Sequence, residues 1–71
     1  IAISQREAEV LLLLGQGYRQ NEVSEKLGIT LRTVKMHRAN LKNKLNLNTL
    51  VELTRYCDEH LPSIDRIAKG N

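Results

Sequence analysis

The hydrophobic residues of this chain recur at the spacing of α-helices, and capping residues stand between the hydrophobic stretches. The first stripe comprises Val10, Leu11 and Leu14. Ser4 and Glu7 precede it at the spacing of a capping box, in which each side chain accepts a hydrogen bond from the other residue's backbone N–H. Gly15 and Gly17 follow, where glycine commonly ends a helix. The pattern predicts a first helix after Ser4.

Two more helices follow in close succession. The second is expected over about Gln20–Leu27, with Val23 and Leu27 turned inward, and it should stop at Gly28. Thr30 can cap a third helix that runs to Leu45. The inward stripe of this third helix comprises Val34, Leu41 and Leu45.

A fourth helix is predicted after the break Asn46-Leu47-Asn48. Thr49 and Glu52 repeat the capping-box spacing, and Pro62 should end the helix or nearly so. Its apolar positions include Leu50, Leu53 and Cys57. We therefore expect an all-α four-helix bundle over residues 1–61, followed by a C-terminal tail over residues 62–71, in which Ser63 to Asn71 could form a weak extra turn.

The composition fits one small intracellular domain. The chain has 71 residues, 41% of them hydrophobic, and with neither Trp nor Phe the core must consist of Leu, Ile and Val. Its longest apolar run, Val10 to Leu14, is far shorter than a membrane span requires. A single cysteine cannot form an internal disulfide, so a reducing compartment is expected. Because the chain starts at Ile1, we interpret it as part of a longer protein.

The positive charge is concentrated in the predicted third helix. The net charge is +3, yet residues 1–25 carry two basic against four acidic residues, and residues 46–71 carry three against four. The basic residues between them, with no acidic one, are Lys26, Arg32, Lys35, Arg38, Lys42 and Lys44. A basic helix entered through a tight turn fits the major groove of DNA and releases counterions from phosphates. A solvated basic helix without a partner is the alternative.

The chain also resembles a known family, over about Ile3 to Cys57. The resemblance rests on Ser4-x-Arg6-Glu7-x-Glu9-Val10-Leu11, Glu22-Val23-Ser24-Glu25-Lys26-Leu27-Gly28-Ile29-Thr30, and Thr33-Val34-Lys35-x-His37-x-x-Asn40-Leu41-x-x-Lys44-Leu45. These segments are similar to the LuxR-type (GerE/FixJ/NarL-like) DNA-binding domain. The resemblance implies a helix-turn-helix module of a bacterial transcription regulator, cytoplasmic and at the nucleoid when bound, controlled by an N-terminal receiver or ligand-binding domain.

The resemblance and the helical periodicity together nominate DNA-contacting residues. The resemblance implies that Lys35 and Met36 face base edges. The periodicity places four residues opposite Val34 and Leu41, and these predicted base-facing residues are Lys35, Met36, Ala39 and Asn43. The predicted contacts to the DNA backbone are Arg19, Gln20, Asn21, Thr30, Arg32, Thr33, His37 and Lys42. Arg19 stands where the family usually has Ser or Thr, so it forgoes a side-chain helix cap.

The fourth helix and one position of the first are candidate protein contacts. The resemblance implies homodimerisation on DNA through the fourth helix, whose edge of Leu50, Val51 and Thr54 is more apolar than a solvent face requires. Leu12 occupies an outward position that is commonly polar in the family. It is interpreted as an isolated surface leucine, or as a contact for the missing regulatory domain or RNA polymerase.

No catalytic residue, metal site or cofactor is predicted. Cys57 and His60 are three residues apart and could touch one ion, but a structural zinc site needs four ligands. The serines and histidines form no recognisable nucleophile–base set. Cys57 is better explained as a small buried residue.

Three other functions remain compatible with these residues. A promoter-reading domain of a sigma factor ends in a similar helix-turn-helix but needs no dimerising helix. A recombinase arm would bind DNA while its chemistry lay on another domain. A helical protein-interaction module would use the basic face to bind an acidic partner.

Overall fold

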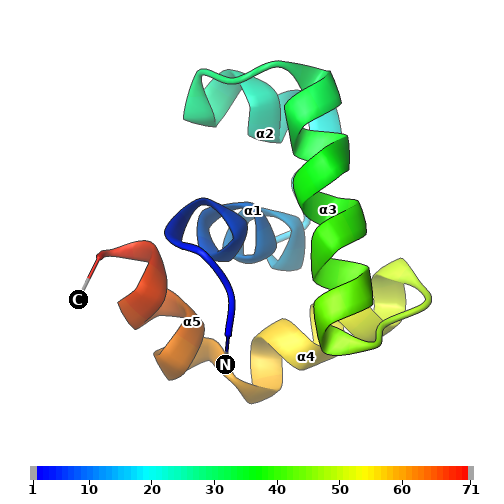
Figure 1. Cartoon of the computed structure of the whole chain (residues 1–71), viewed down its shortest axis with the longest axis vertical. Coiled ribbons are helices and arrows are strands. Elements are labelled where there is room, and N and C mark those ends of the chain that lie inside the picture. Colours follow the sequence, from blue (N-terminus) through cyan, green and yellow to red (C-terminus); the bar gives the residue numbers. More distant parts are fainter. Residues whose placement is uncertain (1, 71) are drawn as a thin grey trace.

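The structure is a computed structural model that describes residues 2–70. It consists of α1 (Gln5–Gly15), α2 (Gln20–Leu27), α3 (Leu31–Leu45), α4 (Leu50–Glu59) and α5 (Leu61–Ala68), with no strand in this range. Figure 1 shows α1 at the centre, α2 above it, α3 along one side, and α4 and α5 below. The all-α class is confirmed. No helix among the described residues is long and apolar enough to cross a membrane.

The helices begin and end at the capping residues that the sequence indicates. The Ser4 hydroxyl accepts from the Glu7 N–H at 3.1 Å, and the Glu7 carboxylate accepts from the Ser4 N–H at 2.8 Å. Thr30 caps α3 by accepting from the Thr33 N–H at 3.1 Å. Asn46 ends α3 in the left-handed conformation, with φ of 56°. Local hydrogen bonds therefore set the bounds of α1 and α3.

The core is built around α1, which contacts each of the other four helices. Its buried residues form one broad face that extends the predicted stripe; they are Glu7, Ala8, Val10, Leu11 and Leu14. The other helices supply one or two fully or nearly fully buried side chains each, namely Val23, Val34, Leu41, Leu53, Cys57 and Ile64. A broad buried surface on a short helix thus organises a core of aliphatic side chains and one thiol.

Gly15 has a role that differs from the cap predicted for it. It is the last residue of α1, and Gln16 is the C-cap. A Cβ atom at position 15 would lie 2.6 Å from the Cys57 Sγ, which real Cβ contacts essentially never show. Glycine is therefore required here because α4 passes against α1 at this point. Gly17, with φ of 98°, is the residue that turns the chain after the helix.

Most of the expected tail is instead a helix, α5, which ends at Ala68; Asn71 lies outside the described residues. Pro62 does not end α4, which stops at Glu59; it lies in the first turn of α5. Proline fits this position because its missing N–H would have no partner there, and its φ suits a helix. The fold thus contains five helices among the described residues, one more than the sequence analysis predicted.

The fifth helix is part of the core. Ile64 is fully buried, and Ile67 and Ala68 pack against the same cluster. The Gln5 side chain donates to the Ala68 carbonyl oxygen at 3.2 Å, which joins the start of α1 to the end of α5. The region after residue 61 therefore stabilises the helix on which the whole core depends.

Replacing Ile64 by alanine should lower the free energy of unfolding by about 2–5 kcal/mol, because it leaves a cavity in the core. The melting temperature, followed by circular dichroism, should fall by roughly 10 °C or more. Leu61→Ala is the control: Leu61 belongs to the same helix but is 46% exposed, so its loss should cost less than about 0.5 kcal/mol. Similar small effects of both changes would show that α5 does not support the fold.

Candidate nucleic-acid interface

The second and third helices form a helix-turn-helix. α2 packs against α3, and the three residues Gly28, Ile29 and Thr30 join them. Gly28 is left-handed, with φ of 66°, and its N–H donates to the Ser24 carbonyl. Ile29 tucks its side chain partly against the core. A tight turn that begins with a left-handed glycine therefore connects α2 to α3.

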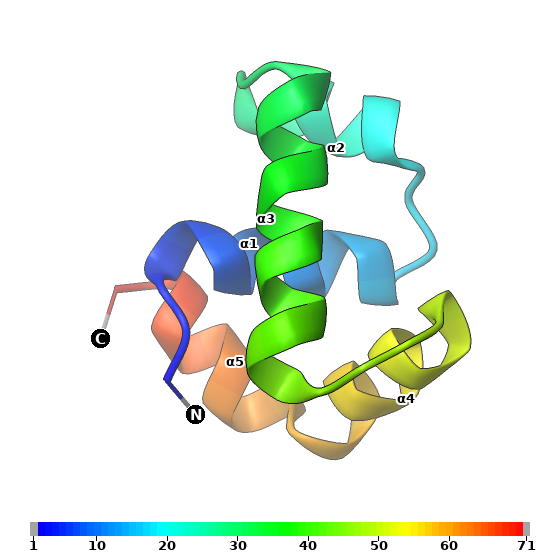
Figure 2. The ribbon, with the colours of Figure 1, turned by 45° about the vertical axis from the view of Figure 1, so that its right-hand side comes forward.

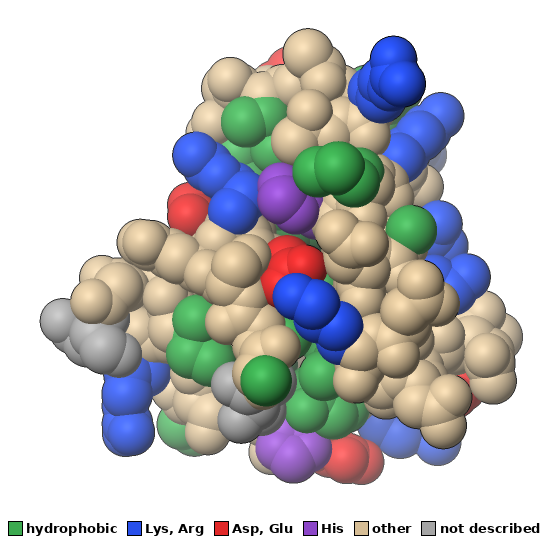
Figure 3. All heavy atoms as spheres, in the orientation of Figure 1, with side chains coloured by type: hydrophobic (Ala, Val, Ile, Leu, Met, Phe, Trp, Pro, Cys, Tyr) green, Lys and Arg blue, Asp and Glu red, His purple; other side chains and the backbone are tan. Residues whose placement is uncertain are grey.

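The outer face of α3 is uncovered. Figures 1 and 2 show that no other helix lies on the side of α3 that faces away from α1. Val34 and Leu41 are fully buried on the inner side. The four residues predicted to face bases are all exposed on the outer side: Lys35, Met36, Ala39 and Asn43. Figure 3 shows Lys and Arg side chains along the edge formed by α3.

The residues predicted to contact the DNA backbone are less uniform. Arg19, Asn21, Thr30 and Arg32 are exposed, whereas Gln20, Thr33, His37 and Lys42 are half-buried. The Thr30 hydroxyl is already engaged in capping α3 and lies 2.9 Å from the Thr33 hydroxyl. Gln20 Oε1 and His37 Nδ1 are buried without a hydrogen-bond partner among the described residues. Lys42 lies in the last turn of α3, far from the others, and Arg19, Asn21 and Arg32 are the exposed members of the set besides the capping residue Thr30.

Arg19 starts α2 without a side-chain cap, as predicted, since a guanidinium cannot accept a hydrogen bond. The Glu22 carboxylate accepts from the Arg19 backbone N–H at 2.9 Å and so satisfies one donor of the helix start. The Arg19 side chain remains exposed and forms no ion pair in the described part of the chain.

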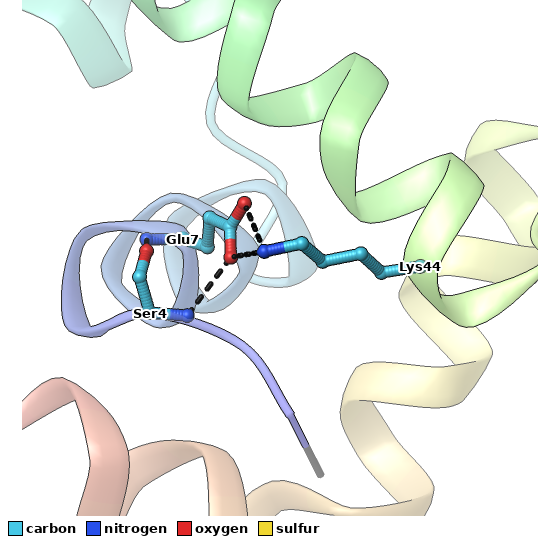
Figure 4. A network of polar contacts seen from close by, with 3 residues as sticks. All are labelled: Ser4, Glu7 and Lys44. Atoms are coloured by element: carbon cyan, nitrogen blue, oxygen red, sulfur yellow. Dashed lines mark hydrogen bonds and ion pairs between the residues drawn. The ribbon is translucent and has the colours of Figure 1, made fainter.

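Lys44, which the sequence analysis counted in the basic segment, is paired with a carboxylate of the same domain. Its Nζ lies 2.8 Å and 3.1 Å from the two carboxylate oxygens of Glu7, a residue that is only 3% exposed. Figure 4 shows Lys44 reaching from α3 to the capping box of α1. The sequence analysis predicted Glu7 only as a capping residue of the first helix. It did not predict the ion pair, because Lys44 lies 37 residues away and no local pattern connects the two.

Lys26, another residue of the basic segment, is also engaged within the domain. Its Nζ lies 4.6 Å from the centroid of the Tyr18 ring, within the range of a cation–π contact. The exposed cations without an ion-pair partner on the outer side of α3 are therefore Arg32 and Lys35.

The pairing with Lys44 alters the acidity of Glu7. Burial raises the pKa of the Glu7 carboxyl, but hydrogen bonds from Lys44 and Ser4 and the charge of Lys44 outweigh it, so the pKa lies below its ordinary value. The ionised carboxylate therefore stabilises the fold above the unfolded-state pKa, and this contribution is lost as the pH falls through the folded-state pKa.

The fourth helix presents the predicted apolar edge. Leu50 is 51% exposed and Val51 is 67% exposed. Thr54 is half-buried, and its hydroxyl donates to the Leu50 carbonyl at 2.9 Å. A shallow hollow of about 390 Å³ is lined by these three residues with Arg55 and Asp58 at its rim. The edge is thus open to a partner.

Leu12 is less isolated than the sequence suggests. It is half-buried and packs against the core cluster. It also lines a hollow of about 190 Å³ together with Leu13, Gln16, Glu9 and Leu27. Leu12 therefore contributes both to packing and to a surface depression between α1 and α2.

Two helices joined by a three-residue turn, with the second one basic and open on its outer side, define a helix-turn-helix DNA-binding domain. Residues 2–57 match the family described as "Bacterial regulatory proteins, luxR family". The chain belongs to this family of DNA-binding transcription regulators, and the predicted resemblance is confirmed. The match ends before α5 begins.

Curated relatives agree with this assignment. The chain is 41% identical over 54 residues to the Oxygen regulatory protein NreC of Staphylococcus carnosus (strain TM300). It is 39% identical over 54 residues to the NreC proteins of Staphylococcus epidermidis (strain ATCC 12228 / FDA PCI 1200) and Staphylococcus aureus (strain USA300). Each alignment covers 76% of this chain and 25% of the relative, so the chain spans about a quarter of the length of these relatives. No solved structure matches the chain significantly.

Replacing Lys44 by methionine should destabilise the domain by about 1–3 kcal/mol at neutral pH, because the buried carboxylate loses its charged partner. The loss should shrink as the pH falls through the lowered pKa of Glu7, where the carboxyl becomes protonated and no longer needs a cation. Denaturant unfolding at several pH values measures both effects.

Lys35→Met is the matched control for this change, since Lys35 is exposed on the same helix without an ion-pair partner. It should alter stability by less than about 0.5 kcal/mol at any of these pH values. A loss for Lys44→Met that does not vary with pH would contradict the role assigned to the Glu7 pair.

Proposed function

We propose that this chain is the C-terminal output domain of a response regulator, which binds specific duplex DNA through α3 and dimerises on the DNA through α4. The observation that carries the proposal is the outer face of α3, which no other helix covers (Figure 2) and on which Arg32, Lys35 and Met36 are exposed. The similarity to the Oxygen regulatory proteins named NreC, of which the alignment covers 25%, supports the place of the domain within a larger regulator.

The charges divide between holding the fold and meeting the ligand. Lys44 contacts Glu7 and Lys26 contacts the Tyr18 ring within the domain. Arg19 and Arg32, by contrast, are exposed to solvent at the starts of α2 and α3. Phosphate contacts position a protein on DNA and carry no sequence information. We therefore assign Arg19, Asn21 and Arg32 to the DNA backbone, with Gln20, Thr33, His37 and Lys42 in supporting contacts. Lys35, Met36, Ala39 and Asn43 are assigned to the bases.

The affinity of this chain for duplex DNA should fall steeply with salt, by about 0.9 log units per phosphate contact for each log unit of salt. Arg32→Ala should reduce that slope by about one contact and weaken all duplexes alike, because it removes a cation that binds phosphate. Fluorescence anisotropy over a salt series measures the slope.

Arg66→Ala is the control for the salt series, since Arg66 is an exposed arginine of α5, on the other side of α1 from α3. It should leave the slope unchanged. A response to salt that is flat for the unaltered chain would refute DNA binding and favour a module that binds an acidic protein.

The dimer proposal rests on the edge of α4. Leu50 and Val51 expose more than half of their side chains, on a helix that otherwise packs into the core with Leu53 and Cys57. Arg55 and Asp58 flank the edge, so a two-fold related copy can place opposite charges across the contact. One helix-turn-helix reads few base pairs, and two copies on half-sites about one turn apart double the contacts. The edge is short, so we expect dimers on DNA and monomers without it.

Val51→Glu should abolish cooperative filling of a paired site, because it places like charges against each other across the two-fold axis. Binding to a single half-site should stay nearly unchanged. Gel-shift titrations on full and half sites measure both. Leu61→Glu introduces the same charge at an exposed apolar position of α5 and should keep the cooperativity. If the Val51 variant still fills the paired site cooperatively, α4 is not the dimer contact.

The depression beside Leu12 is assigned to a protein contact. Leu12, Leu13 and Leu27 line it, and Glu9 and Gln16 stand at its polar edge. Such a surface between α1 and α2 suits the missing regulatory domain of the same protein or RNA polymerase.

A further inference from the structure

One exposed apolar side chain of α3 is not explained by packing. Met36 is 51% exposed, more than Leu31, the other large exposed hydrophobic side chain of α3, which is 39% exposed. Ala39 lies on the same side one turn further on, and it is exposed as well. A single exposed methionine is ordinary. Here, however, it lies with Ala39 in the middle of the face that the proposed function turns toward DNA.

The major groove offers one apolar group to such a pair. Guanine presents two acceptors, adenine an acceptor and a donor, and cytosine a donor, whereas thymine presents a C5-methyl group beside its acceptor. Met36 and Ala39 can form no strong hydrogen bond with a base edge. They can exclude water from a methyl group, which is the apolar contact that favours thymine.

The polar residues of the same face restrict the neighbouring bases. Lys35 is a donor only, and guanine presents the two acceptors that suit it. Asn43 carries both a donor and an acceptor, which is the pattern of adenine. α3 contains no Asp or Glu, so no carboxylate is present to accept from cytosine.

The spacing along α3 agrees with successive base pairs. Four residues of an α-helix rise about 6 Å, so Lys35 and Ala39 are separated by nearly two base-pair steps of about 3.4 Å. Met36 lies between them along the axis. Asn43 is about 12 Å beyond Lys35 along the same face.

Resting on the proposed function, we infer that α3 reads a half-site in which a guanine is followed within two base pairs by a thymine whose methyl group packs against Met36 and Ala39. Met36 is thus a specificity-determining residue that recognises a methyl group, and Lys35 supplies the neighbouring polar contact.

The test separates the methyl group from every other feature of the base pair. A half-site is first selected from random duplexes with the chain of residues 1–71. Each thymine of the selected site is then replaced in turn by deoxyuridine, which removes only the C5-methyl. At one position within two base pairs of a guanine, affinity should fall about fourfold, the value of one buried methyl group. For Met36→Ala the same replacement should change affinity less than twofold.

Two further variants complete the design. Met36→Leu retains an apolar side chain and should keep the sensitivity to deoxyuridine. Leu61→Ala removes an exposed leucine from α5 and should behave like the unaltered chain. These results would exclude a general effect of surface hydrophobicity.

The outcomes distinguish this inference from the proposal beneath it. A chain that binds no duplex at all overturns the proposed function and the inference together. A chain that binds duplex DNA overturns the inference alone in any of three cases: it selects no thymine near a guanine, it tolerates deoxyuridine at every position, or it is equally sensitive when Met36 is alanine. In those cases the exposed Met36 serves a partner other than the bases.

Discussion

The burial of α1 is the constraint on which the rest of the structure depends. A chain of this size without Phe or Trp must build its core from small aliphatic groups. It does so by enclosing one helix, whose Ala8 and Leu11 are completely buried and which the other four helices all contact. The close approach of α4 to α1 requires glycine at position 15, because α4 leaves no space there for a side chain. Because α2, α3 and α4 each pack on α1, the angle of the helix-turn-helix and the exposure of the α4 edge follow from that one packing arrangement.

The burial of α1 also determines which basic residues of α3 are paired within the domain, as the ion pair between Glu7 and Lys44 shows. The carboxylate that caps α1 is carried into the core, where an unpaired charge would be costly. Lys44 neutralises it from the last turn of α3. The C-terminal end of α3 is thereby tied to α1, while its first two turns keep their cations on the surface. The division between structural and ligand-facing charge thus lies along a single helix.

The three surfaces that we assign to partners lie where the packing around α1 leaves side chains exposed. The outer face of α3, the edge of α4 and the depression beside Leu12 each face away from the central helix or lie at its margin. The surface of α1 that would otherwise remain open is covered by α5, which lies beyond the segment matching the luxR family. In this chain the added helix completes the core without covering either surface assigned to DNA or to the dimer.

The sequence by itself determined the bounds of α1 to α3 and the exposed side of α3, because capping and periodicity act within about four residues. Thr30 and Asn46 mark the ends of α3, and Val34 with Leu41 fixes its rotation, so Lys35 and Met36 must face outward. Pro62 was misread because proline both ends helices and begins them, and local sequence does not distinguish the two. Only the tertiary structure decided that Ile64 enters the core and that Lys44 is held by Glu7. These contacts join residues far apart in the chain, and they depend on how whole helices pack.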